Sequence, residues 1–146
     1  MVETSLYIHI PFCRRRCGYC DFNTFEGMNS YLPDYVKALG KEIDFMLGQA
    51  PESLSIATIY FGGGTPSLLK EDHFEQIFRR IRQHVLISTN AEISLEANPD
   101  TVTSQSILDL RKVGFNRISF GMQSAALHDL RILDRQHSNL SVENAV

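Results

Sequence analysis

Three cysteines on one short segment are the residues of this sequence best suited to chemistry. Cys13, Cys17 and Cys20 are separated by three and two residues, and the chain has no other cysteine. Thiolates spaced in this way can occupy three corners of an iron–sulfur cube and leave the fourth iron without a protein ligand. An odd number of cysteines so close together cannot form the disulfide framework of a secreted fold. We therefore interpret them as a local device that holds a 4Fe-4S cluster.

Two other uses of these cysteines stay open on spacing alone. Residues 17–20 have the C-x-x-C form of a thioredoxin-like redox pair, and His9 could complete a zinc site with the three cysteines. A c-type haem attachment is excluded because residue 21 is Asp and not His. The arginine run at 14–16 is interpreted as a solvated part of the same loop.

A glycine-rich turn, residues 62–66 (GGGTP), follows the apolar run 56–61. It lacks the Gly-Lys-Ser/Thr ending of a phosphate-binding P-loop and the glycine spacing of a dinucleotide fingerprint. Three successive glycines cost more chain entropy than an ordinary turn requires. We expect the backbone N–H and C=O groups here to meet the amino or carboxylate end of a ligand, although a plain tight turn stays open.

Polar residues also follow the next two predicted strands. Glu96 stands between apolar neighbours at a strand end, where it could bind a ribose diol or lie exposed at the rim. Gln123 and Ser124 come after the following strand. They could be binding residues, or they could belong to a solvated loop. Arg135 and His137 lie near the end of a predicted helix, where positive charge suits the helix dipole.

The elements that must position these residues alternate along the chain. Hydrophobic patterning predicts strands at 5–10, 56–61, 92–97 and 116–120, and helices at 31–47, 71–85, 104–113 and 125–135. Gly114 suits the position just after the third helix. Such alternation indicates β/α units around a parallel sheet, with functional loops at the carboxyl ends of the strands. The predicted fold class is therefore α/β.

Bulk properties narrow the possible functions. The chain has 146 residues, 43% of them hydrophobic, which suits one globular domain. A formal net charge of -3 gives no basic field for nucleic acid. We find no spanning membrane segment and no signal sequence, so we expect a cytoplasmic protein. Because four β/α units can neither close a barrel nor cover the last strand, we interpret residues 1–146 as the N-terminal portion of a larger fold.

Taken together, the motifs resemble the radical S-adenosylmethionine (SAM) superfamily. Within it they are similar to the branch of oxygen-independent coproporphyrinogen III oxidases and their haem-chaperone relatives. The resemblance covers nearly the whole chain and rests on residues 7–13 (YIHIPFC), Cys17, Tyr19, Cys20, 62–66 (GGGTP), 96–99 (EANP), 117–124 (RISFGMQS) and 135–137 (RQH).

The resemblance implies an incomplete parallel (β/α)6 barrel, of which residues 1–146 supply the first four β/α units. It implies that Cys13, Cys17 and Cys20 hold the 4Fe-4S cluster, and that SAM chelates the fourth iron and is cleaved reductively to a 5'-deoxyadenosyl radical. Tyr7 would shape the cluster end of the site. Gly63 would contact the first SAM through its backbone, and Glu96 would contact the ribose of that SAM. The positions that match contacts to a second SAM are Tyr19, where a Phe is familiar, and Gly64, Thr65, Gln123 and Arg135.

One departure separates the two branches. The oxidases carry a further cysteine two positions after the third cluster ligand, whereas this sequence has Phe22 there. The pairs Asp21-Phe22 and Gln123-Ser124, together with His137, resemble the haem-chaperone branch. This implies haem or a porphyrin and a haem-acceptor protein as partners besides SAM. The alternative is an oxidase that decarboxylates coproporphyrinogen III to protoporphyrinogen IX, and a zinc module would leave the glycine turn and Glu96 unexplained.

Overall fold

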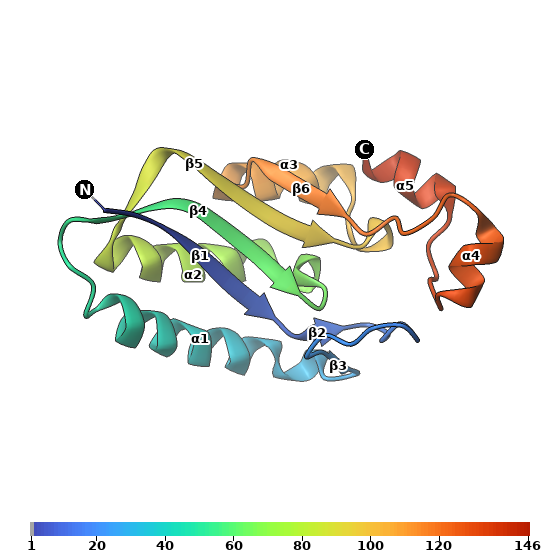
Figure 1. The fold of residues 1–146 in the computed structure, drawn as a ribbon, viewed down its shortest axis with the longest axis horizontal. Coiled ribbons are helices and arrows are strands. Elements are labelled where there is room, and N and C mark those ends of the chain that lie inside the picture. The colour runs from blue at the N-terminus through green and yellow to red at the C-terminus, as the bar shows by residue number, and fades with distance from the viewer. Residues whose placement is uncertain (1) are drawn as a thin grey trace.

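The computed structural model describes residues 2–146, in which four parallel strands form one sheet (Figure 1). The strands lie side by side in chain order: β1 (Val2–Ile10), β4 (Leu54–Gly63), β5 (Leu86–Ala97) and β6 (Arg117–Phe120). They are connected by three helices: α1 (Leu32–Leu47), α2 (Glu71–His84) and α3 (Ser104–Val113). Figure 1 shows the strand arrows pointing toward the end of the molecule where α4 and β2 lie. The predicted α/β class with a parallel sheet is confirmed.

The hydrophobic core lies between the sheet and these helices. Alternate residues along each strand point to opposite sides, so Ile59 and Phe61 of β4 face the helices together. Phe61 packs edge-on against Phe74 of α2 and against Phe115, with ring centroids 5.3 Å apart in both cases. Phe78 of α2 joins the same aromatic cluster. Edge-to-face rings add to the hydrophobic burial that holds α2 on the sheet.

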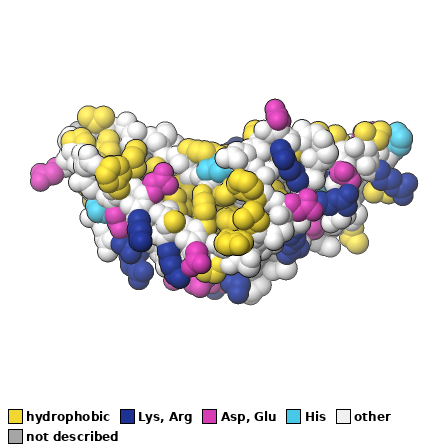
Figure 2. Space-filling model, turned by 90° about the horizontal axis from the view of Figure 1, so that it is seen from below, with side chains coloured by type: hydrophobic (Ala, Val, Ile, Leu, Met, Phe, Trp, Pro, Cys, Tyr) yellow, Lys and Arg dark blue, Asp and Glu magenta, His cyan; other side chains and the backbone are white. Residues whose placement is uncertain are grey.

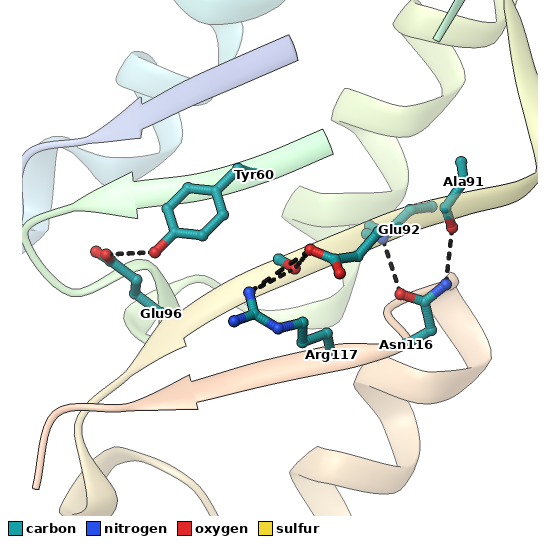
Figure 3. A network of polar contacts seen from close by, with 8 residues as sticks. Tyr60, Ala91, Glu92, Glu96, Asn116 and Arg117 are labelled. Atoms are coloured by element: carbon teal, nitrogen blue, oxygen red, sulfur yellow. Dashed lines mark hydrogen bonds and ion pairs between the residues drawn. The ribbon is translucent and has the colours of Figure 1, made fainter. Parts of the chain in front are cut away.

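The opposite side of the sheet is polar. Figure 3 shows Tyr60 of β4 and Glu96 of β5 pointing toward one another on this side, with Glu92 and Arg117 further along the strands. Arg117 lies 3.5 Å from the carboxylate of Glu92. Asn116 joins β5 to the start of β6, because its side chain accepts from Ile93 N–H and donates to the Ala91 carbonyl, both at 2.8 Å.

A short strand pair closes the base of the cysteine loop. β2 (Phe12–Cys13) pairs in parallel with β3 (Phe25–Glu26), and Phe25 N–H also donates to the Pro11 carbonyl at 2.7 Å. The chain between these strands is therefore tied at both ends next to the carboxyl end of β1.

The observed elements extend or shorten several predicted ones. β1 and β5 begin earlier than predicted, and β4 includes the first two glycines of the turn. Gly114 ends α3 with a φ of 128°, as expected for a glycine in that position. The predicted fourth helix is too long, since α4 spans Leu127–Ile132 and Asp134 then turns the chain with a φ of 58°. Arg135 and His137 thus lie beyond the helix, and the helix-dipole interpretation of both is wrong.

The last element was not predicted. α5 spans Asn139–Ala145 and is capped by Ser138, whose hydroxyl accepts from the N–H of Ser141 at 3.3 Å.

No helix within residues 2–146 is long and apolar enough to cross a bilayer. Seen from below, hydrophobic side chains gather near the middle of the molecular surface, with charged side chains of both signs around them (Figure 2).

Candidate functional site

A cavity of about 340 Å³ opens where β4, β5 and β6 end. A volume of this size is within the range of small-ligand pockets. The cavity brings together the three predicted cluster cysteines and every predicted SAM-contact residue except Tyr7. Its wall holds Cys13, Cys17, Tyr19, Cys20, Gly63, Gly64, Thr65, Glu96, Gln123 and Arg135, together with Phe22, Thr24 and Asn98.

All three cysteines are free thiols, and each sulfur has a polar neighbour. The Thr65 hydroxyl donates to Cys13 Sγ at 3.7 Å, and Arg135 Nη1 donates to Cys17 Sγ at 3.4 Å. The Thr24 hydroxyl lies 3.8 Å from Cys20 Sγ.

Burial raises the pKa of the Cys13 thiol, and electrostatic repulsion from the neighbouring Cys20 and Cys17 adds to this, while hydrogen bonds from Thr65 and Thr24 oppose it. A cationic iron centre would reverse that preference, because sulfur ligands of iron are deprotonated. Three thiols at one cavity, each with a hydrogen-bond partner, are a donor set that fits an iron–sulfur cluster.

His9, the fourth ligand of the alternative zinc site, does not point its ring nitrogens at the cysteines. His9 Nε2 lies 2.9 Å from the carbonyl oxygen of Asn23, so this nitrogen carries the proton and donates it. His9 Nδ1 then accepts from the Tyr7 hydroxyl, also at 2.9 Å. Both ring nitrogens are engaged away from the cysteines. In the described part of the chain, no three His, Cys, Asp or Glu side chains gather closely enough to hold a single metal ion. Thiolates of a cube bind separate irons and need not converge on one point.

The glycine turn allows close packing of neighbouring chain segments. Gly63 has a φ of 113°, and a Cβ there would lie 2.5 Å from the His9 ring. A Cβ on Gly64 would lie 2.7 Å from the carbonyl oxygen of Phe12. The Gly64 N–H donates to the carbonyl of Ile10, and the Thr65 N–H donates to the carbonyl of Phe12, both at 2.8 Å. These two N–H groups are therefore used within the fold, whereas contact of the turn's C=O groups with a ligand stays a prediction.

Glu96 is held at the cavity wall by two donors. The Tyr60 hydroxyl donates to Oε1 at 2.6 Å (Figure 3). The Gly63 N–H donates to Oε2 at 3.2 Å. The carboxylate is partly buried, so the alternative of a free rim residue is wrong. Burial and the hydrogen bond to Glu96 raise the pKa of Tyr60 to about 12. Sequence reasoning missed Tyr60, although its position between Ile59 and Phe61 places it on the opposite face from the core.

Asn98 is a second residue that sequence reasoning missed. Arg135 Nη2 donates to Asn98 Oδ1 at 2.8 Å, and Asn98 Nδ2 donates to Thr65 Oγ1 at 3.4 Å. Asn98 therefore connects the partners of Cys17 and Cys13. Its place directly after Ala97, at the carboxyl end of β5, was the available signal.

The remaining predicted residues lie around this centre. Tyr7 does not line the cavity; its ring stacks on Tyr60 with centroids 6.2 Å apart. Tyr19 is 47% exposed at the wall, and Gln123 is exposed with a φ of 65°. Ser124 accepts from the Ala126 N–H at 3.1 Å just before α4. His137 is buried and its Nε2 donates to the carbonyl of Met122 at 2.9 Å.

Comparison with known proteins identifies the class. The sequence profile of the Radical SAM superfamily matches residues 7–146, so the chain belongs to this superfamily. The sheet and helices described above are the corresponding part of its parallel β/α barrel, as the solved structure below supports.

Particular members are similar over most of the chain. The heme chaperone HemW of Mycobacterium tuberculosis (strain H37Rv) is 39% identical over 137 residues, and HemW of Escherichia coli (strain K12) is 38% identical over 143 residues. These alignments cover 92% and 97% of this chain but only 35% and 37% of those proteins. The solved coproporphyrinogen III oxidase HemN of Escherichia coli, a radical SAM enzyme, matches with a TM-score of 0.87 and 29% identity, over 94% of this chain and 32% of that one. The chain thus spans about a third of the length of the curated relatives it matches.

Proposed function

We propose that this chain is the N-terminal, cofactor-binding portion of a radical SAM haem chaperone. The observation that carries the proposal is the single cavity onto which three free thiols and the fixed Glu96 carboxylate open. The similarity to HemW proteins supports the chaperone over other members of the superfamily. We further propose SAM, haem or a porphyrin, and a haem-acceptor protein as partners, in the cytoplasm.

Cys13, Cys17 and Cys20 would hold the 4Fe-4S cluster, and SAM would lie beside it. When bound, the cluster and SAM supply the one-electron cleavage of a carbon–sulfur bond that defines the superfamily. Glu96 would accept hydrogen bonds from the ribose hydroxyls of SAM. Because Tyr60 and Gly63 already hold its carboxylate, Glu96 pays little ordering entropy on binding.

A second SAM would meet a different part of the wall. Of the five positions that match such contacts, Gly64 and Thr65 use their N–H groups within the fold, and Arg135 is engaged by Asn98 and Cys17. Tyr19 and Gln123 are the two whose side chains are exposed at the cavity. We therefore propose that they carry most of any contact to a second SAM.

Phe22 favours the chaperone over the oxidase. Its side chain lines the cavity and is 69% exposed. A phenyl ring at this position puts an apolar surface where the oxidase branch has a thiol. Such a ring can neither ligate iron nor transfer a proton.

The test uses the full-length protein with a demonstrated full cluster under anaerobic reducing conditions. We expect it to bind haem, to pass haem to an apo-acceptor, and to leave coproporphyrinogen III intact by mass spectrometry in the presence of SAM. Phe22→Cys is the matched variant, since it restores the thiol of the oxidase branch. Loss of two carboxyl groups from the porphyrinogen over many turnovers by the wild type would make the protein an oxidase. Haem that binds but is never transferred would also contradict the chaperone assignment.

A further inference from the structure

Two consecutive side chains in the turn after α4, Asp134 and Arg135, contact the cysteine loop. Asp134 Oδ1 lies 2.7 Å from Arg15 Nη2, and Arg135 Nη1 lies 3.4 Å from Cys17 Sγ. Asp134 has a φ of 58°, a left-handed conformation that few residues other than Gly, Asn and Asp adopt. This conformation places both side chains against a loop more than a hundred residues away in the sequence.

Arg135 is itself fixed by the sheet. Its Nη2 donates to Asn98 Oδ1 at 2.8 Å and to the carbonyl of Gly121 at 2.6 Å. Asn98 follows β5 and Gly121 follows β6, so the guanidinium joins both strand ends to Cys17.

Within residues 2–146, Arg135 forms no ion pair with a carboxylate. Its Nε is buried without a hydrogen-bond acceptor among these residues. Arg135 is partly buried, and a cation withdrawn from water is stabilised by a nearby anion. The nearest group that can become anionic is the Cys17 sulfur, to which Arg135 already donates.

We propose that Arg135 is a positioning residue for Cys17 and sets the reduction potential of the cluster; this rests on the proposed function. Among residues 2–146, the hydrogen-bond partners of the Cys13 and Cys20 sulfurs are the neutral hydroxyls of Thr65 and Thr24, whereas Cys17 has a charged donor. Reduction adds negative charge to the cluster, and a nearby cation stabilises that added charge. Arg135 therefore raises the potential, and Asn98 links its action to Thr65 and Cys13.

The experiment measures the midpoint potential of the cluster in the full-length protein by a redox titration followed by electron paramagnetic resonance. SAM is left out, so that a lost contact to SAM cannot cause the shift. The variants are Arg135→Gln, which keeps a donor without the charge, Arg135→Lys, which keeps the charge without the planar fork, and Asp134→Asn, which tolerates the same φ. Arg131→Gln, on α4, is the matched control, because it removes an arginine outside the cavity.

We expect Arg135→Gln to hold the same iron and sulfide as wild type with a more negative potential. Arg135→Lys should recover part of the shift, Asp134→Asn should lose its cluster faster to a chelator, and Arg131→Gln should match wild type. If Arg135→Gln assembles no cluster, Arg135→Met, which also removes the charge, is titrated in its place. A wild-type potential in the neutral variant that holds a cluster overturns this inference alone. A wild-type protein without a cluster overturns the proposed function, and this inference with it.

Discussion

The helix-facing side of the sheet and its opposite side are built from the same strands but differ in chemistry. Facing the helices, Ile59, Phe61 and Leu95 are all 0% exposed. On the other side, Tyr60 and Glu96 are partly exposed and joined by a hydrogen bond. A barrel interior that serves only packing carries branched apolar side chains. The polar side chains support our proposal that this side of the sheet binds a ligand, while the apolar side packs against the helices and supplies stability.

The largest expected effect comes from breaking the apolar face. Phe61→Ala removes a ring that contacts Phe74, Phe78 and Phe115, and should lower the free energy of unfolding by about 3–5 kcal/mol. Urea unfolding followed by circular dichroism measures this. Tyr60→Phe, at the neighbouring position on the polar face, is the control and should cost about 1.5 kcal/mol or less. Equal losses in the two variants would contradict the division between the faces.

The next effect comes from the polar face. Glu96→Gln should weaken SAM binding by about 1.5–3 kcal/mol, because a charged acceptor of the ribose hydroxyls is lost. Calorimetry with the full-length protein measures the affinity. Glu92→Gln is the matched control, since Glu92 lies on the same face of β5 but pairs with Arg117 outside the cavity. If both variants bind SAM as wild type does, Glu96 is not part of the site.

A smaller effect should follow from removing the donor to Glu96. Tyr60→Phe keeps the ring that stacks on Tyr7 but loses the hydroxyl, and should weaken SAM binding by about 0.5–1.5 kcal/mol. The loss should be absent in the Glu96→Gln background if Tyr60 acts only through that carboxylate. Additive losses in the double variant would instead mean that Tyr60 acts independently.

The smallest expected effect concerns the pKa of the Tyr60 hydroxyl. Burial and Glu96 raise the pKa of Tyr60 from 10.0 to about 12, so the folded protein keeps this proton where the unfolded chain has lost it. Its contribution to stability is complete below pH 10 and is lost as the pH rises through about 12. The difference in phenolate absorbance between wild type and Tyr60→Phe should titrate near the higher value. A difference that titrates near pH 10 would show that Glu96 does not hold this hydroxyl.

The apolar face was more predictable from sequence than the polar one. The helices at 31–47, 71–85 and 104–113 were predicted within a residue or two, because each repeats buried residues at helical spacing. The ends of α4 were misplaced and α5 was missed, since these helices of six and seven residues repeat too few positions to give a periodic signal. α5 depends instead on its cap at Ser138.

The cysteines and Glu96, which a motif or a resemblance named in advance, line one cavity in the structure. Tyr60 and Asn98 could not be found in this way, because their roles depend on partners contributed by other segments of the chain. The glycine turn was located correctly, but its N–H groups proved to be used within the fold. The register of β1 against β4 places Ile10 beside Gly63, so the carbonyl of Ile10 can accept from the next N–H group, that of Gly64. This register could not be predicted from the sequence.

The central claim is that Cys13, Cys17 and Cys20 together hold a 4Fe-4S cluster at this cavity. Its most direct test is iron, sulfide and zinc analysis of the anaerobically reconstituted full-length protein, beside the three single Cys→Ala variants. The account predicts about four irons and four sulfides per chain in the wild type, with sulfur-to-iron charge-transfer absorption, and loss of most of both elements in every variant. Stoichiometric zinc without that absorption, or an intact cluster in any of the three variants, would contradict it.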